Sequence, residues 1–173
     1  DPGALAREVC DAQGWQLCET RFYTGVHSPE GNAYWHRFWA AKLSQMGRQG
    51  VITFRRELRY QNTTVSLPDG RQMTTAVGQE KGIDVRIALD IVRRVIAGGC
   101  DVVLVFSQDQ DLSEVATEVR MISSREDRWL KIASAYPVGP TSRNRRGING
   151  TDWIPFDKDT YDRCIDPRDY RPP

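Results

Sequence analysis

The clearest hydrophobic pattern in the chain is an amphipathic helix followed by a short apolar strand. Ile83, Ile87 and Ile91 recur at helical spacing and predict a helix over residues 82–96. Two glycines then end the helix. Residues 101–106, DVVLVF, form an almost uninterrupted apolar run. Such a run is typical of a central parallel strand that is buried on both faces.

Acidic side chains follow this strand directly. The chain continues with Ser107, Gln108, Asp109, Gln110 and Asp111, and a second helical pattern begins after them. In open α/β sheets the carboxyl edge is where ligands bind, and carboxylates gathered there can hold a hard divalent cation. Alternatively, one of the aspartates simply caps the following helix. The segment alone favours neither interpretation.

A third carboxylate, Asp84, lies in the first turn of the predicted helix over residues 82–96. A right-handed connection brings the start of that helix and the end of the next strand to the same sheet edge. We therefore expect Asp84 to approach Asp109 and Asp111. Crowded carboxylates repel one another, so the arrangement favours a bound cation or a raised pKa.

The rest of the chain alternates helical and extended patterns. It predicts helices over 2–13, 32–46 and 112–125, strands over 17–26, 51–54 and 129–138, and a final strand and short helix within 150–164. The strand over 129–138 is expected to be the last parallel one. A Pro-Asp-Gly turn between two β-prone runs predicts a hairpin near 62–77. We expect one α/β domain over residues 1–165 and an irregular tail over 166–173.

The aromatic residues of the segment 32–46 include Tyr34 and Trp35 and lie along one helical stripe. At this spacing most of them are expected in the core, although aromatic faces at a rim also stack on unpaired bases.

Basic residues occur at three places near the expected ligand edge. They are Arg55, Arg56 and Arg59 after the strand over 51–54, Lys81 before Asp84, and Arg143, Arg145 and Arg146 after the strand over 129–138. Guanidinium groups there would contact phosphates, or they would simply be solvated. Lys81 would neutralise a phosphate or pair with Glu80 or Asp84. The arginines after residue 138 would form an RNA clamp or a solvated loop.

Composition narrows the class of protein. The chain has 173 residues, 39% of them hydrophobic and 27% charged, with a net charge of +1. This net charge excludes a protein that coats nucleic acid with a uniformly basic surface, but it allows a local basic groove. No apolar run reaches membrane-spanning length, and four dispersed cysteines without a CxxC pair indicate reduced thiols in a cytoplasmic protein. His27 and His36 lack a catalytic triad pattern.

Two motifs carry a family resemblance: KGIDVRIALDIV at residues 81–92 and SQDQDL at residues 107–112. Together they resemble the NYN family of the PIN-like nuclease superfamily. The resemblance implies a three-layer α/β/α fold with a mainly parallel central sheet, into which the hairpin near 62–77 is inserted. Gln108 departs from the small residue usual at its position. The family's first acidic strand is not seen before Asp1, and we expect it to lie upstream.

The resemblance also implies an activity, namely metal-dependent endoribonuclease cleavage of RNA. Asp84, Asp109 and Asp111 would be the catalytic carboxylates and would bind Mg²⁺ or Mn²⁺. Ser107 would shape the turn, and Lys81 with the arginines would position the RNA backbone. The alternative is a catalytically degenerate module that binds RNA or a protein. A haloacid-dehalogenase-like phosphotransferase fits less well, because its DxD pair would come too late in the chain. The hairpin would guide substrate or form a homodimer.

Overall fold

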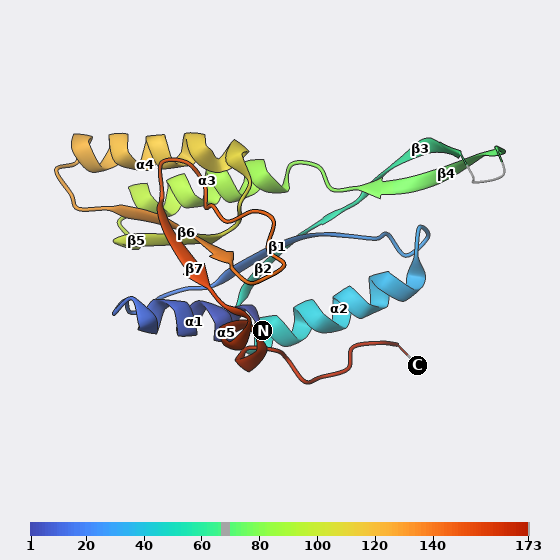
Figure 1. Cartoon of the computed structure of the whole chain (residues 1–173), viewed down its shortest axis with the longest axis horizontal. Coiled ribbons are helices and arrows are strands. Elements are labelled where there is room, and N and C mark those ends of the chain that lie inside the picture. Colours follow the sequence, from blue (N-terminus) through green and yellow to red (C-terminus); the bar gives the residue numbers. More distant parts are fainter. Residues whose placement is uncertain (67–69, 173) are drawn as a thin grey trace. The chain divides into compact units, whose positions relative to one another are not determined.

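The computed structural model describes residues 1–66 and 70–172, and it contains both helices and strands (Figure 1). The contacts divide the chain into two compact units. The first unit comprises Asp1–Cys18 and Asp84–Asp166, and the second comprises Glu19–Ile83 with the residues from Pro167 onward. Each unit is described here by itself. The protein is a mixed α/β structure with parallel strands.

The first unit contains a parallel sheet in the order β5-β6-β7. Its strands are β5 (Val102–Phe106), β6 (Lys131–Pro137) and β7 (Asp152–Phe156). The central strand β6 is buried along almost its whole length. The expectation that the strand over 129–138 is the last parallel one is wrong, because β7 pairs with it in the parallel sense.

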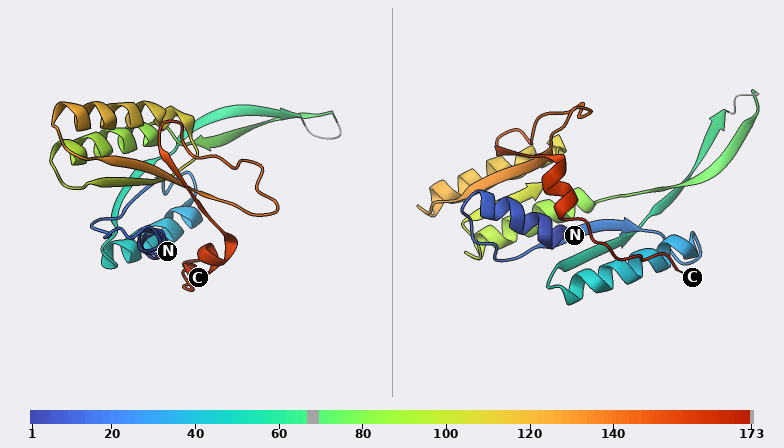
Figure 2. Two further views of the ribbon diagram at one scale, coloured as in Figure 1. Left: turned by 60° about the vertical axis from the view of Figure 1, so that its left-hand side comes forward. Right: turned by 60° about the horizontal axis from the view of Figure 1, so that its bottom comes forward.

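Helices pack on this sheet through two separate apolar clusters. The helical elements of the unit are α1 (Pro2–Ala12), α3 (Ile83–Ile96), the 3-10 turn η1 (Gln110–Leu112), α4 (Ser113–Arg125) and α5 (Lys158–Arg163). Ile132 of β6 belongs to a cluster with α3 and α4, which run side by side in Figure 2. Ala133 and Ala135 instead pack against Val9 of α1. Alternate side chains of a strand point to opposite faces, so the two clusters lie on opposite faces of β6.

The strand β5 differs from its prediction as a buried central strand. It lies at the edge of its sheet, and its residues are only half-buried or, for Phe106, 40% exposed. The reason is that, within the part of the chain that the structure describes, only β6 pairs with it. The apolar run therefore indicated a strand correctly but not its position in the sheet.

The second unit combines the parallel pair β1 (Arg21–Val26) and β2 (Ile52–Glu57) with helix α2 (Ala33–Arg48). A small core holds these elements together and consists of Val26, Leu43, Met46 and Val51. The aromatic stripe of α2 was expected mainly in the core. Trp35, which is 44% exposed, departs from that expectation.

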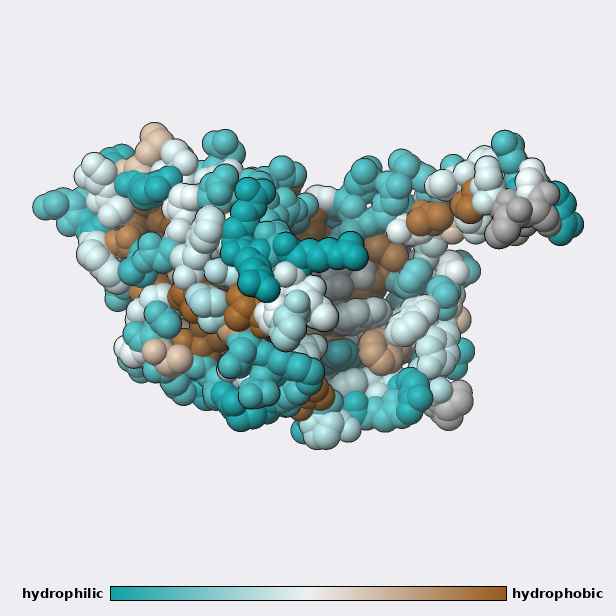
Figure 3. Space-filling model, viewed as in Figure 1, coloured by the Kyte–Doolittle hydropathy of each residue, from teal (hydrophilic) through white to brown (hydrophobic). Residues whose placement is uncertain are grey.

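The second unit also contains the predicted hairpin. Strands β3 (Arg59–Ser66) and β4 (Gln72–Gln79) pair in the antiparallel sense over their full length. Of the predicted Pro-Asp-Gly turn, Pro68 and Asp69 lie outside the described residues. Every residue of β3 is exposed, and Figure 3 shows hydrophobic patches among the hydrophilic surface of the hairpin.

Candidate functional site

Two loops meet at the carboxyl edge of the sheet in the first unit. The acidic loop (residues 107–111) follows β5, and the arginine loop (residues 141–147) follows β6. Because β5 and β6 are parallel neighbours, both loops leave the sheet at the same edge. Acidic and basic side chains are thus concentrated where open α/β sheets bind ligands.

Two glutamine side chains tie these loops together. Gln108 Nε2 donates to the carbonyl oxygens of Asn144 and Arg146 at 3.3 and 2.8 Å. Gln110 Nε2 donates to the carbonyl oxygen of Gly147 at 3.1 Å. Sequence reasoning missed this role, since it treated Gln108 only as a departure from a family pattern. The signals available for this role were the length of the Gln108 side chain and its position beside a basic loop.

The end of the arginine loop is anchored in the core. Ile148 is 1% exposed, and its backbone N–H donates to Ser134 Oγ at 2.9 Å. Ser134 is fully buried and also shares a hydrogen bond with Thr151 Oγ1 at 2.7 Å. Trp153 Nε1 donates to the carbonyl oxygen of Ile148 at 2.8 Å. Buried polar groups need such partners, so this network fixes where the loop leaves the core.

The arginines of the loop remain on the surface. Arg143, Arg145 and Arg146 are all exposed, while Gly147 directly after them is buried. The loop is held at one end and carries three exposed guanidinium groups. It therefore makes a local positive patch on a chain whose net charge is only +1. Such a patch suits phosphate oxygens, which guanidinium binds in a bidentate manner.

The acidic loop has a defined structural role. Asp109 caps η1, because its side chain accepts a hydrogen bond from the Asp111 N–H at 3.0 Å. Ser107 Oγ accepts from the Asp109 N–H at 3.1 Å, which tightens the same turn. Asp109 thus caps the 3-10 turn that precedes α4, whereas α4 itself has Leu112 at its N-cap position and no side-chain cap. The capping hydrogen bond uses only part of the acceptor capacity of the Asp109 carboxylate, which keeps further oxygen lone pairs for a ligand.

The other two predicted carboxylates are exposed at the surface of the first unit. Asp84 lies in the first turn of α3, as predicted, and Asp111 lies in η1. Within the described ranges 1–66 and 70–172, neither carboxylate accepts a hydrogen bond or forms an ion pair. Asp152, at the start of β7, is paired with Lys131 at 2.5 Å.

The fit of a metal ion to these groups is incomplete. Among the residues that the structure describes, no three or more His, Cys, Asp or Glu side chains gather closely enough to hold a metal ion. Asp84, Asp109 and Asp111 therefore do not form a complete cation site by themselves. Their joint binding of Mg²⁺ or Mn²⁺ stays a prediction.

The remaining predicted basic residues belong to the second unit. Arg56 Nη1 donates to the carbonyl oxygen of Lys81 at 3.2 Å, and its guanidinium lies 5.8 Å from the Phe54 ring centroid. Arg55 and Arg59 are exposed on the same segment. Glu80 accepts from the backbone N–H of Gly25, so it does not pair with Lys81. The Arg56 side chain and the Lys81 backbone are therefore in direct contact.

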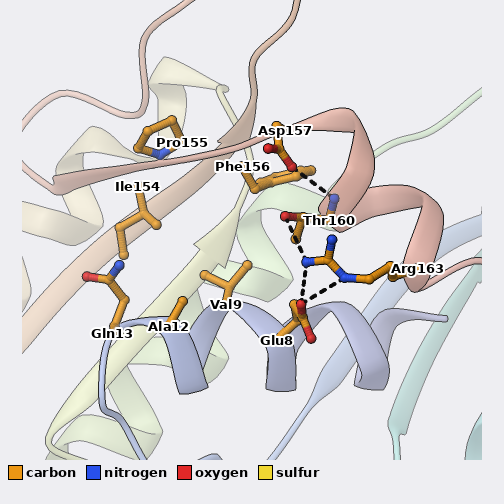
Figure 4. Close-up of a pocket in the computed structure, with 10 residues that line it drawn as sticks. All are labelled: Glu8, Val9, Ala12, Gln13, Ile154, Pro155, Phe156, Asp157, Thr160 and Arg163. Atoms are coloured by element: carbon orange, nitrogen blue, oxygen red, sulfur yellow. Dashed lines mark hydrogen bonds and ion pairs between the residues drawn. The ribbon is translucent and has the colours of Figure 1, made fainter.

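A small pocket lies between α1, β7 and α5 (Figure 4). Arg163 and Glu8 form an ion pair at one side of it, which raises the pKa of Arg163. Asp157 caps α5, and the hydrogen bond from the Thr160 backbone N–H lowers the pKa of that carboxyl group. The cavity volume is about 200 Å³. That is less than most ligand sites enclose, and Glu8, Asp157 and Arg163 in its lining already have hydrogen-bond partners.

Comparisons with known proteins gave no match among family models, curated proteins or solved structures. The resemblance carried by residues 81–92 and 107–112 therefore remains an interpretation of the sequence. In the described part of the chain, none of the helices combines the length and apolar character needed to cross a bilayer. All four cysteines are free, and Cys10 and Cys164 are buried.

Proposed function

We propose that the chain acts on RNA as an endoribonuclease of the NYN type, with its substrate at the carboxyl edge of the β5-β6-β7 sheet. The observation that carries the proposal is the pair of glutamine ties between the acidic and arginine loops. They hold carboxylates and guanidinium groups on adjacent loops of one sheet edge. Phosphodiester cleavage needs both kinds of group close to the scissile phosphate.

RNA is the substrate that fits this patch best. Arg143, Arg145 and Arg146 are exposed and follow one another within four residues, which matches a repeating phosphate backbone. The low net charge of +1 implies that binding is local to this loop and not spread over the surface.

A PIN-like three-layer α/β/α arrangement is part of this proposal. It is supported by the two apolar clusters on opposite faces of β6, one with α3 and α4 and the other with α1. Parallel strands covered by helices on both faces are the usual architecture of a ligand-binding α/β domain.

The carboxylates of Asp84, Asp109 and Asp111 supply the proposed catalytic charge. Asp84 and Asp111 are exposed at helix starts, where the helix dipole favours negative charge. A divalent cation, when bound, would supply charge stabilisation at the phosphate. The described residues do not complete a site for that cation by themselves.

A second candidate function is RNA binding without cleavage. Two observations favour it: Asp109 is used as a helix cap, and the described acidic groups do not gather around one ion. In this case the arginine loop alone would account for the interaction with RNA.

A binding and cleavage experiment on the full chain separates the candidates. Replacing Arg143, Arg145 and Arg146 together by glutamine should weaken binding of single-stranded RNA at least tenfold and lower its salt dependence. The matched control replaces three other exposed arginines, Arg7, Arg93 and Arg125, with the same loss of charge. If both variants bind RNA equally, the arginine loop is not the binding site.

Cleavage is then scored on the wild-type chain with Mg²⁺ or Mn²⁺ and with chelator. Cleavage that the chelator stops and that Asp111→Asn abolishes supports the nuclease. RNA binding with no cleavage under any of these conditions supports the second candidate. Absence of RNA binding by the wild-type chain contradicts both.

A further inference from the structure

The β3–β4 hairpin is a surface with unusual chemistry for an exposed ribbon. Residues 60–66 and 72–79 contain no Asp, Glu, Lys, Arg or His. Both strands are mostly exposed along their length. Natural proteins usually place charges or prolines on exposed strand edges, because unpaired backbone groups there recruit another strand. The hairpin lacks these protections over residues 60–66 and 72–79.

The hairpin also has few neighbouring strands to pair with. Two-stranded ribbons are marginally stable in water, and three or more strands with an apolar face are needed for independent stability. Within the described residues β3 and β4 pair only with each other. Near its base, Tyr60 shares a hydrogen bond with His27 Nδ1 at 2.7 Å. The remainder of the ribbon extends away from α2 in both views of Figure 2.

One face of the ribbon carries its apolar side chains. Val65 lies directly opposite Met73 in the register, and Val77 lies four pairs further along β4. Alternation along a strand puts all three on the same face. They are 43%, 51% and 40% exposed, and they account for hydrophobic patches on the hairpin in Figure 3.

The sequence of β4 is self-complementary. When two copies of β4 pair in the antiparallel sense about a two-fold axis through Thr75, Met73 of one copy falls opposite Val77 of the other. Thr75 then faces Thr75, a pair that stabilises antiparallel sheets. The contact between Met73 and Val77 occurs twice, because a two-fold interface uses the same patch on each subunit.

Charge at the ends of β4 agrees with the same register. Arg71 precedes the strand and Glu80 follows it. In the two-fold arrangement Arg71 of one copy falls beside Gln79 and Glu80 of the other, so opposite charges meet at both ends. A corresponding axis through Thr63 of β3 would place Val65 against the polar Gln61. It would also bring no acidic residue to Arg59.

We propose that the hairpin is a dimerisation element, in which β4 pairs with β4 of a second copy of this chain to form a four-stranded antiparallel sheet. The paired sheet satisfies the open backbone edge of β4 and joins the apolar faces of the two ribbons. RNA binding through phosphate contacts is disfavoured at the hairpin, because residues 60–66 and 72–79 include no cationic side chain.

Charge substitution at Thr75 tests the proposal in the full chain. Sedimentation equilibrium of the wild-type protein should show a monomer–dimer equilibrium. Thr75→Lys and Thr75→Glu should each weaken association at least tenfold, because like charges meet at the two-fold axis. An equimolar mixture of the two variants should recover the dimer, because the charges then attract each other.

The matched control is Thr63→Lys. Thr63 is the direct cross-strand neighbour of Thr75 and belongs to β3, so it lies away from the proposed interface. This variant should dimerise as the wild type does. A wild-type protein that stays monomeric overturns the proposal. So does a dimer unaffected by both Thr75 variants, or a dimer broken by Thr63→Lys.

A cross-linking measurement does not depend on how well the charged variants fold. Thr75→Cys should form an intermolecular disulfide under mild oxidation, since paired strands bring these Cα atoms within disulfide range. Thr63→Cys should cross-link no faster than the parent chain with its own cysteines. Preferential cross-linking through position 63, or RNA binding that is lost in Thr75→Glu while the wild type is monomeric, contradicts the proposal.

Discussion

Gln108 Nε2 donates a hydrogen bond to the carbonyl oxygen of Arg146 at 2.8 Å. This contact joins the loop that ends β5 to the loop that ends β6 and crosses 38 residues of sequence. It brings a conspicuous acidic motif and a conspicuous basic motif to one place. The proposed RNA site depends on this relationship.

Removing the second glutamine tie should release the arginine loop. Gln110→Ala loses the donor to Gly147 O and the acceptor for the Asn149 N–H at 3.0 Å. We expect a loss of about 1–3 kcal/mol in the free energy of unfolding, since each hydrogen bond contributes about 0.5–1.5 kcal/mol. Urea denaturation measures the loss, and amide hydrogen exchange should accelerate over residues 141–149. Gln16→Ala, at an exposed position outside this network, should change neither.

The buried hydroxyl under the loop should matter for stability. Ser134→Ala leaves the buried Ile148 N–H without its acceptor, and an unsatisfied buried donor costs about 1–3 kcal/mol. Thermal and urea unfolding should both show the loss. Ser124→Ala, on the exposed face of α4, is the matched control and should stay within about 0.5 kcal/mol of wild type. Equal stability of the two variants would contradict the anchoring role.

Asp109 should separate a structural role from a catalytic one. Asp109→Asn keeps an acceptor for the Asp111 N–H, so its stability should remain close to that of wild type. Asp109→Ala removes the cap and should cost about 0.5–2 kcal/mol. Both variants lose the negative charge, so both should lose RNA cleavage. Cleavage retained by a stably folded Asp109→Asn protein would remove this carboxylate from the proposed catalytic set.

Thiol reactivity should report the burial of the first unit. Burial raises the pKa of the Cys10 and Cys164 thiols, which lowers the fraction of reactive thiolate at a given pH. Iodoacetamide should therefore modify exposed Cys18 at least tenfold faster than either of them in the folded protein. Peptide mass spectrometry gives the rates, which should converge in denaturant. Equal rates in the folded state would show that the α1–α5 packing is open.

The sequence predicted local elements well because their causes are local. The spacing of Ile83, Ile87 and Ile91 indicated α3, and its residue Asp84 lies in the first turn as expected. The change from apolar to acidic residues located the end of β5. Features that depend on distant pairing were less accessible. An apolar run does not say how many strands flank β5, and β5 is an edge strand among the described elements.

The candidate site shows the same division. The sequence located both charged loops at strand ends, but not the glutamine ties, because a side-chain contact across 38 residues leaves no periodic signal. It also misjudged Trp35, which is 44% exposed although most of the aromatic stripe was expected in the core. Helical spacing shows which residues of α2 share a face, while their exposure depends on whether another element covers that face.

Cross-linking of the wild-type chain to RNA tests the central claim most directly. Single-stranded RNA carrying photoreactive uridine is irradiated with the protein, and mass spectrometry identifies the linked peptides. The account predicts that cross-links concentrate on the acidic loop (residues 107–111) and the arginine loop (residues 141–147), and that they decline in Gln110→Ala. Cross-links confined to other surfaces, such as the exposed aromatics of α2, would contradict it, as would a complete absence of RNA binding.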